Sequence, residues 1–312
     1  MIQQETYNQE IKALMMRVFE EQVDYTQEGY QTFSQVLDDE DYMKHYLFYT
    51  KREDQLLGVI GLLDDVIEFF FVDSAHERQG IGRELFNYLL TQTDEHLIVH
   101  ASPNAYGFYH ALGFEDRDEE VTIDGLTTKE MMYLRRCSYV PMNDPLYIHY
   151  HDEEWCVPSH DEHYLYEMLM LECFQAGLSW RTILSKRENF RKAYEGFDPH
   201  KVACFDEEKI NAMMQDAGII RHRRKIEGSI INTRIFLAIE EEWGSFDHYI
   251  WSFTNGEIVY EYDKTRSELS DRVSKDLKKR GMKFVGSVTI YSYLQAIGVI
   301  NSHEPICYKY KK

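Results

Sequence analysis

One apolar stretch between Ser159 and Trp180 constrains the fold of this chain more than any other feature. Ser159 and Glu162 match the S-x-x-E capping box, in which two side chains satisfy backbone N–H groups at the start of a helix. Apolar residues then recur at helical spacing. The pattern predicts an amphipathic helix whose apolar face carries Leu165, Met168, Leu169, Cys173 and Ala176.

The same helical face carries a carboxylate. Glu172 follows Leu165 by two helical turns, so it shares the apolar side. A carboxylate is costly to bury unless it is paired or used, and aromatic residues flank this stretch, as they do where a flat ring is bound. Glu172 is therefore a candidate site residue. Met170 and Leu171 blur the apolar face, which leaves a solvated position for Glu172 at a polar edge as the alternative.

The two halves of the chain differ in charge. The chain has 312 residues, a formal charge of −20 and 44% hydrophobic residues, which suits about two domains. Residues 1–136 contain 11 Lys and Arg against 27 Asp and Glu, whereas residues 137–312 contain 23 against 27. The first half therefore repels nucleic acid at long range. This asymmetry predicts domains at 1–136 and 137–312 with different partners.

The sequence contains neither a secretory leader pattern nor a membrane span. No charged-then-apolar segment opens the chain, and no apolar run reaches the length of about 20 residues that a spanning helix needs. The five cysteines are odd in number and scattered, which argues against a disulfide framework. We expect a cytoplasmic protein without a membrane partner.

Residues 1–136 alternate helix and strand. An apolar strand expected at 66–72 is followed by a loop with Gly80 and Gly82 and then by a helix. These glycines let the backbone approach a ligand, and the helix start offers N–H groups to a phosphate. Glycines at a helix start also serve packing alone. The other expected elements are a helix at 11–21 and strands at 45–50, 55–63 and 97–101.

The glycine loop and the later segment N-A-x-x-F-Y-x-x-L-G-F resemble the GNAT acyltransferase superfamily over residues 1–136. The resemblance implies an α+β domain with a mixed sheet, and acetyl-CoA as cofactor with its pyrophosphate on the loop at 77–82. It implies that Tyr109 protonates the departing thiolate, which leaves more easily when a proton is supplied. The implied cofactor contacts are Phe71, Val72, Gly80, Gly82 and Asn104.

Two positions depart from the family pattern. Glu77 stands where this loop usually opens with Gln or Arg, and Ser74 stands where proline is common. A carboxylate that points at a pyrophosphate is unfavourable, although the contacts of this loop come mainly from its backbone. Glu68 is either a base for an acceptor amine or a solvated strand residue. The acidic composition favours a cationic acceptor, whose identity is unknown.

Cysteine and histidine occur near both ends of the second half. His303 and Cys307 form H-x-x-x-C, and Cys137 and His151 lie at the start of this half. Thiolate and neutral imidazole are ligands of four-coordinate structural zinc. The four residues predict a Cys₂His₂ zinc site that joins the ends of the domain. Two unrelated pairs, with the cysteines as small buried apolar residues, are the alternative.

The rest of the second half is expected to be helical, with basic runs beside glycine turns. Helices are expected at 206–217, from Arg221 to about Glu242, and at 287–296. Basic side chains and glycine-turn amides suit phosphates, whereas most charge runs are solvated helix faces. The candidate DNA contacts are Arg221, Arg223, Arg224, Lys225, Lys278, Lys279, Arg280 and Lys283.

Four segments, DPLYIHYHDEEW, LECFQAGLSW, QDAGIIRHRRKI and SKDLKKRGMKFVGS, resemble the 3-methyladenine DNA glycosylase I family. They occur in family order and the resemblance spans residues 137–307. It implies an all-α domain of the helix-hairpin-helix type with a structural zinc. It also implies a monofunctional hydrolase that flips 3-methyladenine out of alkylated double-stranded DNA and cleaves its N-glycosidic bond. The implied zinc ligands are Cys137, His151, His303 and Cys307.

The resemblance also assigns roles in the pocket and at the DNA. Glu172 is expected to hydrogen-bond the adenine edge, and Gly177 and Leu178 to enter the gap left in the DNA. The expected base-binding aromatic residues are Tyr150 and Trp180, which stack on the base, and Tyr147 and Trp155, which line the pocket. Two alternatives stay open. The chain could be an acetyltransferase with a non-catalytic DNA-binding second half, or its first half could be a degenerate interaction module.

Overall fold

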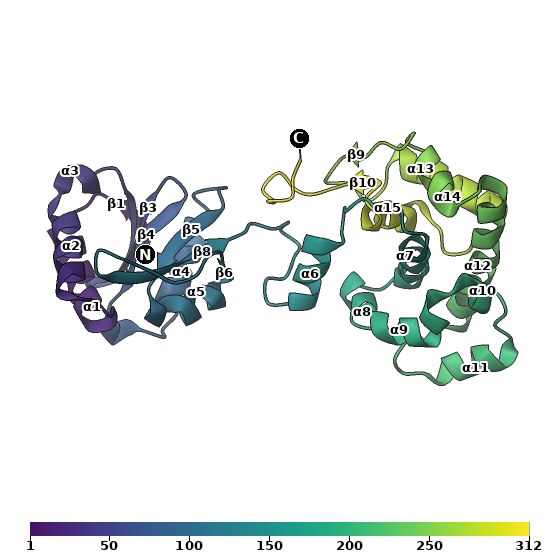
Figure 1. The fold of residues 1–312 in the computed structure, drawn as a ribbon, viewed down its shortest axis with the longest axis horizontal. Helices are drawn as coiled ribbons and strands as arrows, with labels where there is room; N and C mark the ends of the chain where they lie inside the picture. Colours follow the sequence, from purple (N-terminus) through teal and green to yellow (C-terminus); the bar gives the residue numbers. More distant parts are fainter. Residues whose placement is uncertain (312) are drawn as a thin grey trace. The chain divides into compact units, whose positions relative to one another are not determined.

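The structure is a computed structural model that describes residues 1–311. It divides into two compact units, Met1–Arg136 with Ile306–Tyr308, and Cys137–Pro305 with the residues after Tyr308. Figure 1 shows a sheet with helices in the first unit and mainly helices in the second. Among the described helices, none combines the length and apolarity that crossing a membrane requires.

The first unit is built on one mixed sheet. In chain order its elements are β1 (Ile2–Glu5), α1 (Gln9–Gln22), α2 (Gln27–Asp38), α3 (Glu40–Met43), β2 (Leu47–Arg52), β3 (Leu56–Leu63), β4 (Val66–Val72), η1 (Ser74–His76), α4 (Ile81–Leu89), β5 (Leu97–Ala101), η2 (Pro103–Ala105), α5 (Tyr106–Leu112), β6 (Glu115–Asp116), β7 (Val121–Ile123) and β8 (Leu126–Tyr133). The strand order is β1-β2-β3-β4-β5-β8-β6, and β7 pairs with β8. The expected α+β fold with a mixed sheet is confirmed.

Helices cover both faces of this sheet. Successive strand residues point to opposite faces, so Phe48 of β2 packs in a core with α1 and α2, whereas Tyr49 packs in a second core with α4 and α5. Val59 and Ile60 of β3 divide between the two cores in the same way. Strand β3 is buried over nearly its whole length because both of its faces are covered.

The parallel strands β4 and β5 separate after a short contact. They pair only where Val66 lies opposite Ile98 and Ile67 lies opposite Val99. The later part of β4, which ends at Phe71 and Val72, therefore pairs on its β3 side alone. This opening lies at the carboxyl end of β4, the end at which parallel sheets bind ligands.

The second unit is helical apart from one pair of two-residue parallel strands, which agrees with the expected helical fold. In chain order its elements are α6 (Pro145–Glu153), α7 (Glu162–Gln175), α8 (Trp180–Leu184), α9 (Arg187–Ala193), η3 (Glu195–Phe197), α10 (Pro199–Val202), α11 (Glu207–Gln215), α12 (Arg223–Trp243), α13 (Phe246–Ser252), β9 (Val259–Tyr260), α14 (Glu268–Arg280), α15 (Ser287–Ala296) and β10 (Ile300–Asn301).

Helix α7 lies at the centre of the second unit. Helices α12, α13 and α15 pack against it, and Figure 1 shows α7 among the helices of this unit. Every residue from Leu165 to Phe174 is buried. The prediction of an amphipathic helix is therefore wrong, because α7 is surrounded and has no solvated face in this range. Glu172 is buried in this helix and does not lie at a polar edge.

The predicted capping box at the start of α7 is also wrong. Asp161 is the N-cap, and its carboxylate accepts the N–H of Tyr164 at 2.7 Å. The Glu162 carboxylate accepts the N–H groups of Phe246 and Asp247 at 3.2 and 2.8 Å, and so caps the start of α13. The capping residues were misassigned because a carboxylate can cap a helix that is distant in sequence.

Candidate functional site

A cavity of about 200 Å³ lies beside the C-terminal half of α7. It is smaller than the roughly 300–1,000 Å³ of pockets for drug-sized ligands, so it suits a single flat ring system. Five predicted residues line it together: Tyr147 and Tyr150 of α6, Trp155 after α6, Glu172 of α7 and Trp180 at the start of α8.

Aromatic side chains form much of the cavity wall. The ring centroids of Tyr150 and Trp180 lie 5.1 Å apart at an interplanar angle of 47°. Tyr147 stands edge-on to Tyr150, with centroids 6.5 Å apart. Burial, followed by the charge of Glu172, raises the pKa of Tyr147, so its hydroxyl stays protonated. A planar ligand in this cavity meets aromatic faces and edges, which favour stacking.

Glu172 is only 3% exposed although it carries a carboxyl group. Its Oε2 atom and the Nε1 atom of Trp180 are buried, and neither forms a hydrogen bond with the residues that the structure describes. Burial raises the pKa of Glu172 well above its ordinary value, because loss of water disfavours the charged form. Buried polar groups without partners in the wall of one cavity indicate a ligand with complementary hydrogen-bonding groups.

Four lining residues were not predicted from the sequence. Gln175 lies one helical turn after Glu172, so its spacing could have identified it. Ser292 and Gln295 share a face of α15, but no local pattern connects that helix to α7. Tyr139 lies in the loop before α6, where periodicity gives no information. These residues line the cavity together with His151.

The turn after α7 presents an apolar side chain to solvent. Gly177 has a φ of +81°, a conformation that glycine adopts without strain. Leu178 is 40% exposed. The ammonium group of Lys225 holds the start of this turn, because it donates to the carbonyls of Phe174 and Ala176 at 2.8 and 2.6 Å.

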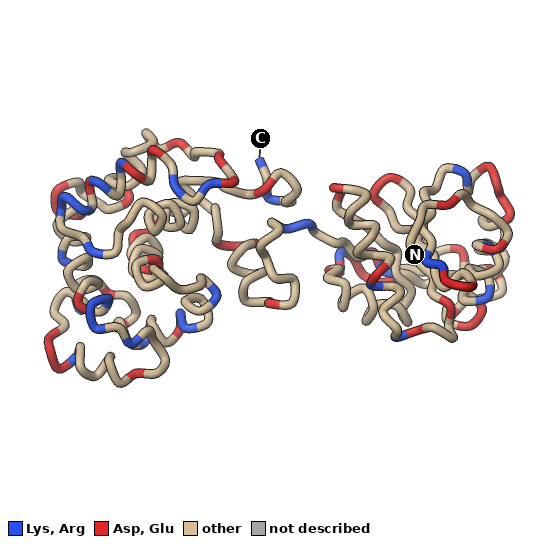
Figure 2. Tube along the Cα trace, turned by 180° about the vertical axis from the view of Figure 1, so that it is seen from behind, with Lys and Arg blue, Asp and Glu red and all other residues tan. Residues whose placement is uncertain are grey.

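The predicted phosphate contacts fall into three groups. Lys225 is buried, so its assignment as a phosphate contact is wrong. Arg223 pairs with Glu207 at 2.7 Å and Arg280 with Glu242 at 2.6 Å. Figure 2 shows basic and acidic positions interleaved along the helical unit. The other candidates are exposed: Arg221, Arg224, Lys278, Lys279 and Lys283.

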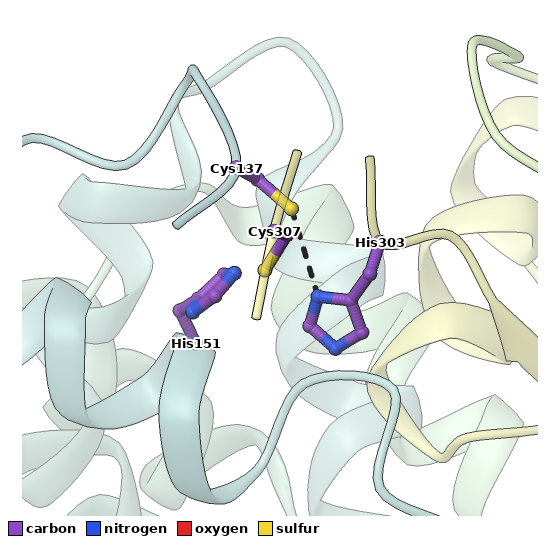
Figure 3. Close-up of side chains that lie close together, drawn as sticks. All are labelled: Cys137, His151, His303 and Cys307. Atoms are coloured by element: carbon purple, nitrogen blue, oxygen red, sulfur yellow. Dashed lines mark hydrogen bonds between the residues drawn. The ribbon is translucent and has the colours of Figure 1, made fainter. Parts of the chain in front are cut away.

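Cys137, His151, His303 and Cys307 come together, as Figure 3 shows. All four are buried, and their ligand atoms lie within 4.8 Å of one another. The Sγ atom of Cys137 lies 3.6 Å from Nδ1 of His303. Tetrahedral zinc with bonds of about 2.0–2.3 Å holds its ligand atoms roughly 3.3–3.8 Å apart. The donor set, burial and spacing of this cluster are consistent with structural zinc.

Neighbouring groups orient the cluster. Nδ1 of His151 lies 2.7 Å from a carboxylate oxygen of Asp152, which leaves Nε2 for a metal. The N–H of Glu304 donates to the sulfur of Cys137 at 3.4 Å. The ring of Trp155 lies 5.9 Å from that of His151 and 4.8 Å from that of His303. The cluster therefore supports the cavity wall that Trp155 forms.

The loop before α4 in the first unit has the expected glycine geometry. Gly80 has a φ of +87°, and apart from Gly80 and its two chain neighbours no heavy atom of the described residues lies within 4 Å of the position that a Cβ atom would take. The first-turn N–H groups of α4 lack helical acceptors. A Cβ at Gly82 would lie 2.9 Å from the ring of Phe108. The side chain of Gln22 at the end of α1 donates to the carboxylate of Glu77, which holds this carboxylate at α1.

The other predicted residues of the first unit lie on α5, η2 and β4. Tyr109 of α5 is buried, and burial raises the pKa of its phenol, which keeps it protonated. The side-chain amide of Asn104 donates to the carbonyl of Gln22 at 2.9 Å and to the carboxylate of Asp24 at 3.2 Å. Glu68 is exposed on β4.

Known proteins match the two halves separately. A family described as methyladenine glycosylase matches residues 140–310, and an acetyltransferase (GNAT) domain family matches residues 21–135. DNA-3-methyladenine glycosylase 1 of Escherichia coli K12 is 48% identical over 180 residues, which are 56% of this chain and 96% of that protein. DNA-3-methyladenine glycosylase of Haemophilus influenzae is 43% identical over 178 residues, 55% and 96% of the two chains.

Solved structures match the second half as well. A crystal structure of 3-methyladenine DNA glycosylase I is 45% identical, has a TM-score of 0.55, and covers 57% of this chain and 100% of its own. A structure of the Staphylococcus aureus enzyme, described as the basis of 3-methyladenine recognition, is 36% identical with a TM-score of 0.55. It covers 57% of this chain and 98% of its own.

Proposed function

Because this chain belongs to the methyladenine glycosylase family, we propose that its C-terminal domain removes 3-methyladenine from alkylated double-stranded DNA. Residues 137–312 form this domain, and residues 1–136 form the GNAT acetyltransferase domain fused to it. One observation carries the proposal. Glu172 presents a buried carboxyl oxygen without a partner to a cavity with aromatic walls.

The base is recognised outside the duplex. Extrusion of a nucleotide costs a few kcal/mol, which stacking on Tyr150 and Trp180 offsets, while Tyr147 and Trp155 complete the pocket wall. N3-methyladenine in DNA carries a positive charge, and this charge favours the ionised form of Glu172, which burial alone disfavours. Unmodified adenine is neutral and brings no such compensation, so the pocket selects the charged base.

The reaction is hydrolysis of the N-glycosidic bond. The N9–C1′ bond breaks and its electron pair goes to the base, which leaves as neutral 3-methyladenine. A water molecule bonds to C1′ and releases a proton to solvent, so an abasic site remains. The positive charge of the base already weakens this bond. The pocket therefore needs stacking and a placed carboxylate more than a strong acid, which supports a monofunctional hydrolase.

The turn after α7 supports the DNA while the base is extruded. Gly177 lets the chain approach the duplex, and the exposed side chain of Leu178 fills the space that the base vacates, as apolar wedges do between base steps. The phosphate backbone is bound by Arg221, Arg223, Lys278, Lys279, Arg280 and Lys283. Of these, Arg223 and Arg280 must exchange carboxylate partners for phosphates.

Zinc has a structural role in this proposal. Cys137, His151, His303 and Cys307 supply four protein ligands, and a four-coordinate site with only protein ligands leaves no position for an activated water. The ion would link the start and the end of the C-terminal domain.

The GNAT domain transfers an acetyl group to an amine that remains to be identified. Acetyl-CoA supplies the acetyl group. Backbone N–H groups of the loop at 77–82, including Gly80 and Gly82, bind the pyrophosphate. Tyr109 donates a proton to the departing thiolate. Phe71, Val72 and Asn104 lie along the cofactor arm, and the acidic surroundings favour a cationic acceptor.

The proposal is tested by incubating the zinc-loaded full chain with methylated duplex DNA and measuring released bases by chromatography. We expect 3-methyladenine in the supernatant and abasic sites in the DNA. An acetyltransferase with a non-catalytic DNA-binding half would bind the DNA and release no base. Calorimetry with acetyl-CoA tests the first domain, since a degenerate interaction module would give no heat of binding.

A further inference from the structure

A second cavity, of about 300 Å³, lies in the C-terminal unit beside β9 and β10. It is larger than the cavity at Glu172, and the two share no lining residue. The proposed glycosylase reaction makes no use of it. Its walls include Tyr260, Glu261, Tyr262, Lys264, Asn301 and Tyr310.

Glu261 supplies a polar group without a partner in this cavity. Its backbone N–H donates to the carbonyl of Asn301 at 3.1 Å, so its position between the strands is fixed. Its Oε2 atom pairs with Lys264 at 2.5 Å. The Oε1 atom is buried and forms no hydrogen bond within residues 1–311. An unsatisfied buried carboxylate oxygen is costly, so it marks a position for a ligand N–H group.

Tyrosines give this cavity stacking surfaces. Tyr260 and Tyr262 are 48% and 46% exposed, and the ring of Tyr310 stands edge-on to Tyr262 with centroids 6.4 Å apart. Exposed aromatic faces stack on nucleobases regardless of sequence. Lys264 is engaged by Glu261, whereas Lys311 also lines the cavity and is exposed. A phosphate therefore has a cation available beside the aromatic faces.

We propose that this cavity binds an unpaired deoxynucleotide, at a site separate from the pocket of Glu172. A tyrosine stacks on the base, Glu261 Oε1 accepts an exocyclic N–H, and Lys311 contacts the phosphate. A cationic amine fits this site less well, because two lysines line it and Lys264 already pairs with one of the two carboxylate oxygens of Glu261. A nucleotide meets the carboxylate, the aromatic faces and the lysine together.

The test is calorimetric titration of the zinc-loaded full chain with dCMP and with dTMP. Pyrimidine nucleotides are chosen because neither is the ligand proposed for the Glu172 pocket or for the acetyl-CoA site. We expect dCMP to bind more tightly than dTMP, because only cytosine carries an exocyclic amine for Glu261. Saturating 3-methyladenine should leave dCMP binding unchanged. Glu261→Gln should remove or reverse the preference, since an amide also donates to the thymine carbonyl.

The stacking contribution is tested with matched tyrosine variants. Tyr262→Ala should weaken dCMP binding about tenfold or more, whereas Tyr42→Ala, at a position 43% exposed in the first unit, should leave it unchanged. Tyr260→Ala replaces Tyr262→Ala if the latter loses zinc. The proposal is overturned if dCMP does not bind, if inorganic phosphate competes as well as dCMP, if 3-methyladenine displaces dCMP, or if the tyrosine variant keeps full affinity.

Discussion

Arg187 of α9 binds Glu154 through both carboxylate oxygens, at 2.9 and 2.7 Å. The same guanidinium donates to Glu167 of α7 at 2.6 Å. Glu154 directly precedes Trp155, and Glu167 lies on the helix that carries Glu172. Arg187 therefore ties the segment with the aromatic wall to the helix with the carboxylate, and it is buried while doing so.

Loss of this contact should destabilise the C-terminal unit. Arg187→Met leaves the partly buried carboxylate of Glu154 without this cation and the buried carboxylate of Glu167 with Arg191 alone, and breaking a buried pair costs about 3–5 kcal/mol. For a domain of about 150–250 residues this corresponds to a fall in Tm of roughly 6–20 °C in calorimetry. Lys201→Met is the control, because Lys201 and Asp198 form an exposed pair at 3.6 Å, and solvent screening leaves such pairs with little effect on stability. Equal shifts for both variants would contradict this account of Arg187.

Glu172→Gln should stabilise the protein at neutral pH. Burial raises the pKa of Glu172 in the folded chain, so the unfolded chain loses its proton first and native stability falls as pH rises above about 4.3. Gln has no proton to lose, so the variant should be more stable than the intact chain at pH 7. The difference should vanish below about pH 4, where both states are protonated. Urea unfolding of both proteins across this pH range measures the difference in their unfolding free energies. A difference that stays the same at low pH excludes titration of Glu172 as its cause.

The amount of zinc that the protein binds should depend on the four clustered residues Cys137, His151, His303 and Cys307. Cys307→Ser should abolish bound zinc measured by elemental analysis and lower the unfolding free energy of the C-terminal unit by several kcal/mol, because metal binding is coupled to folding. Cys204→Ser is the matched control, since Cys204 is exposed and lies outside the cluster. Acetyl-CoA binding should persist in both variants. Full zinc content in Cys307→Ser refutes the ligand assignment.

Gly80→Ala should weaken acetyl-CoA binding. The φ of +87° at Gly80 costs an L-residue about 1–2 kcal/mol, and relaxation of the loop would move its N–H groups away from the pyrophosphate. A fivefold to thirtyfold rise in Kd corresponds to about 1–2 kcal/mol. Gly107→Ala is the control, because Gly107 lies in α5 without a positive φ and with nothing near a Cβ atom. A similar rise in Gly107→Ala would point to a general loss of stability.

The spacing of apolar residues along the sequence predicted individual helices and strands of this protein. The spacing of Leu165 and Glu172 predicted a helix here, because helical periodicity needs no partner, although the amphipathic character expected of this helix was wrong. The strand at Leu97–Ala101 and the helix at Ser287–Ala296 were predicted with the bounds that the structure has, since a short apolar run marks the strand and Gly286 and Gly298 flank the helix.

Features that depend on tertiary contacts were not predicted. Lys225 belongs to a basic run in the sequence, but the carbonyls after α7 draw its ammonium into the interior. Ser292 and Gln295 reach the pocket only because α15 packs on α7. Glu162 fits a local capping box, yet the start of α13 competes for its carboxylate. In each case the partner is distant in the sequence.

The central claim is that Glu172 makes the C-terminal pocket a 3-methyladenine glycosylase, and single-turnover base release tests it most directly. The intact chain, Glu172→Ala and the control Glu188→Ala, which alters an exposed carboxylate, are compared on methylated duplex DNA at equal zinc content. We predict release by the intact chain and by Glu188→Ala, and a fall of about a hundredfold or more in Glu172→Ala, as for loss of a group that stabilises transition-state charge. Unchanged release in Glu172→Ala, or no release by the intact zinc-loaded chain, would contradict the account.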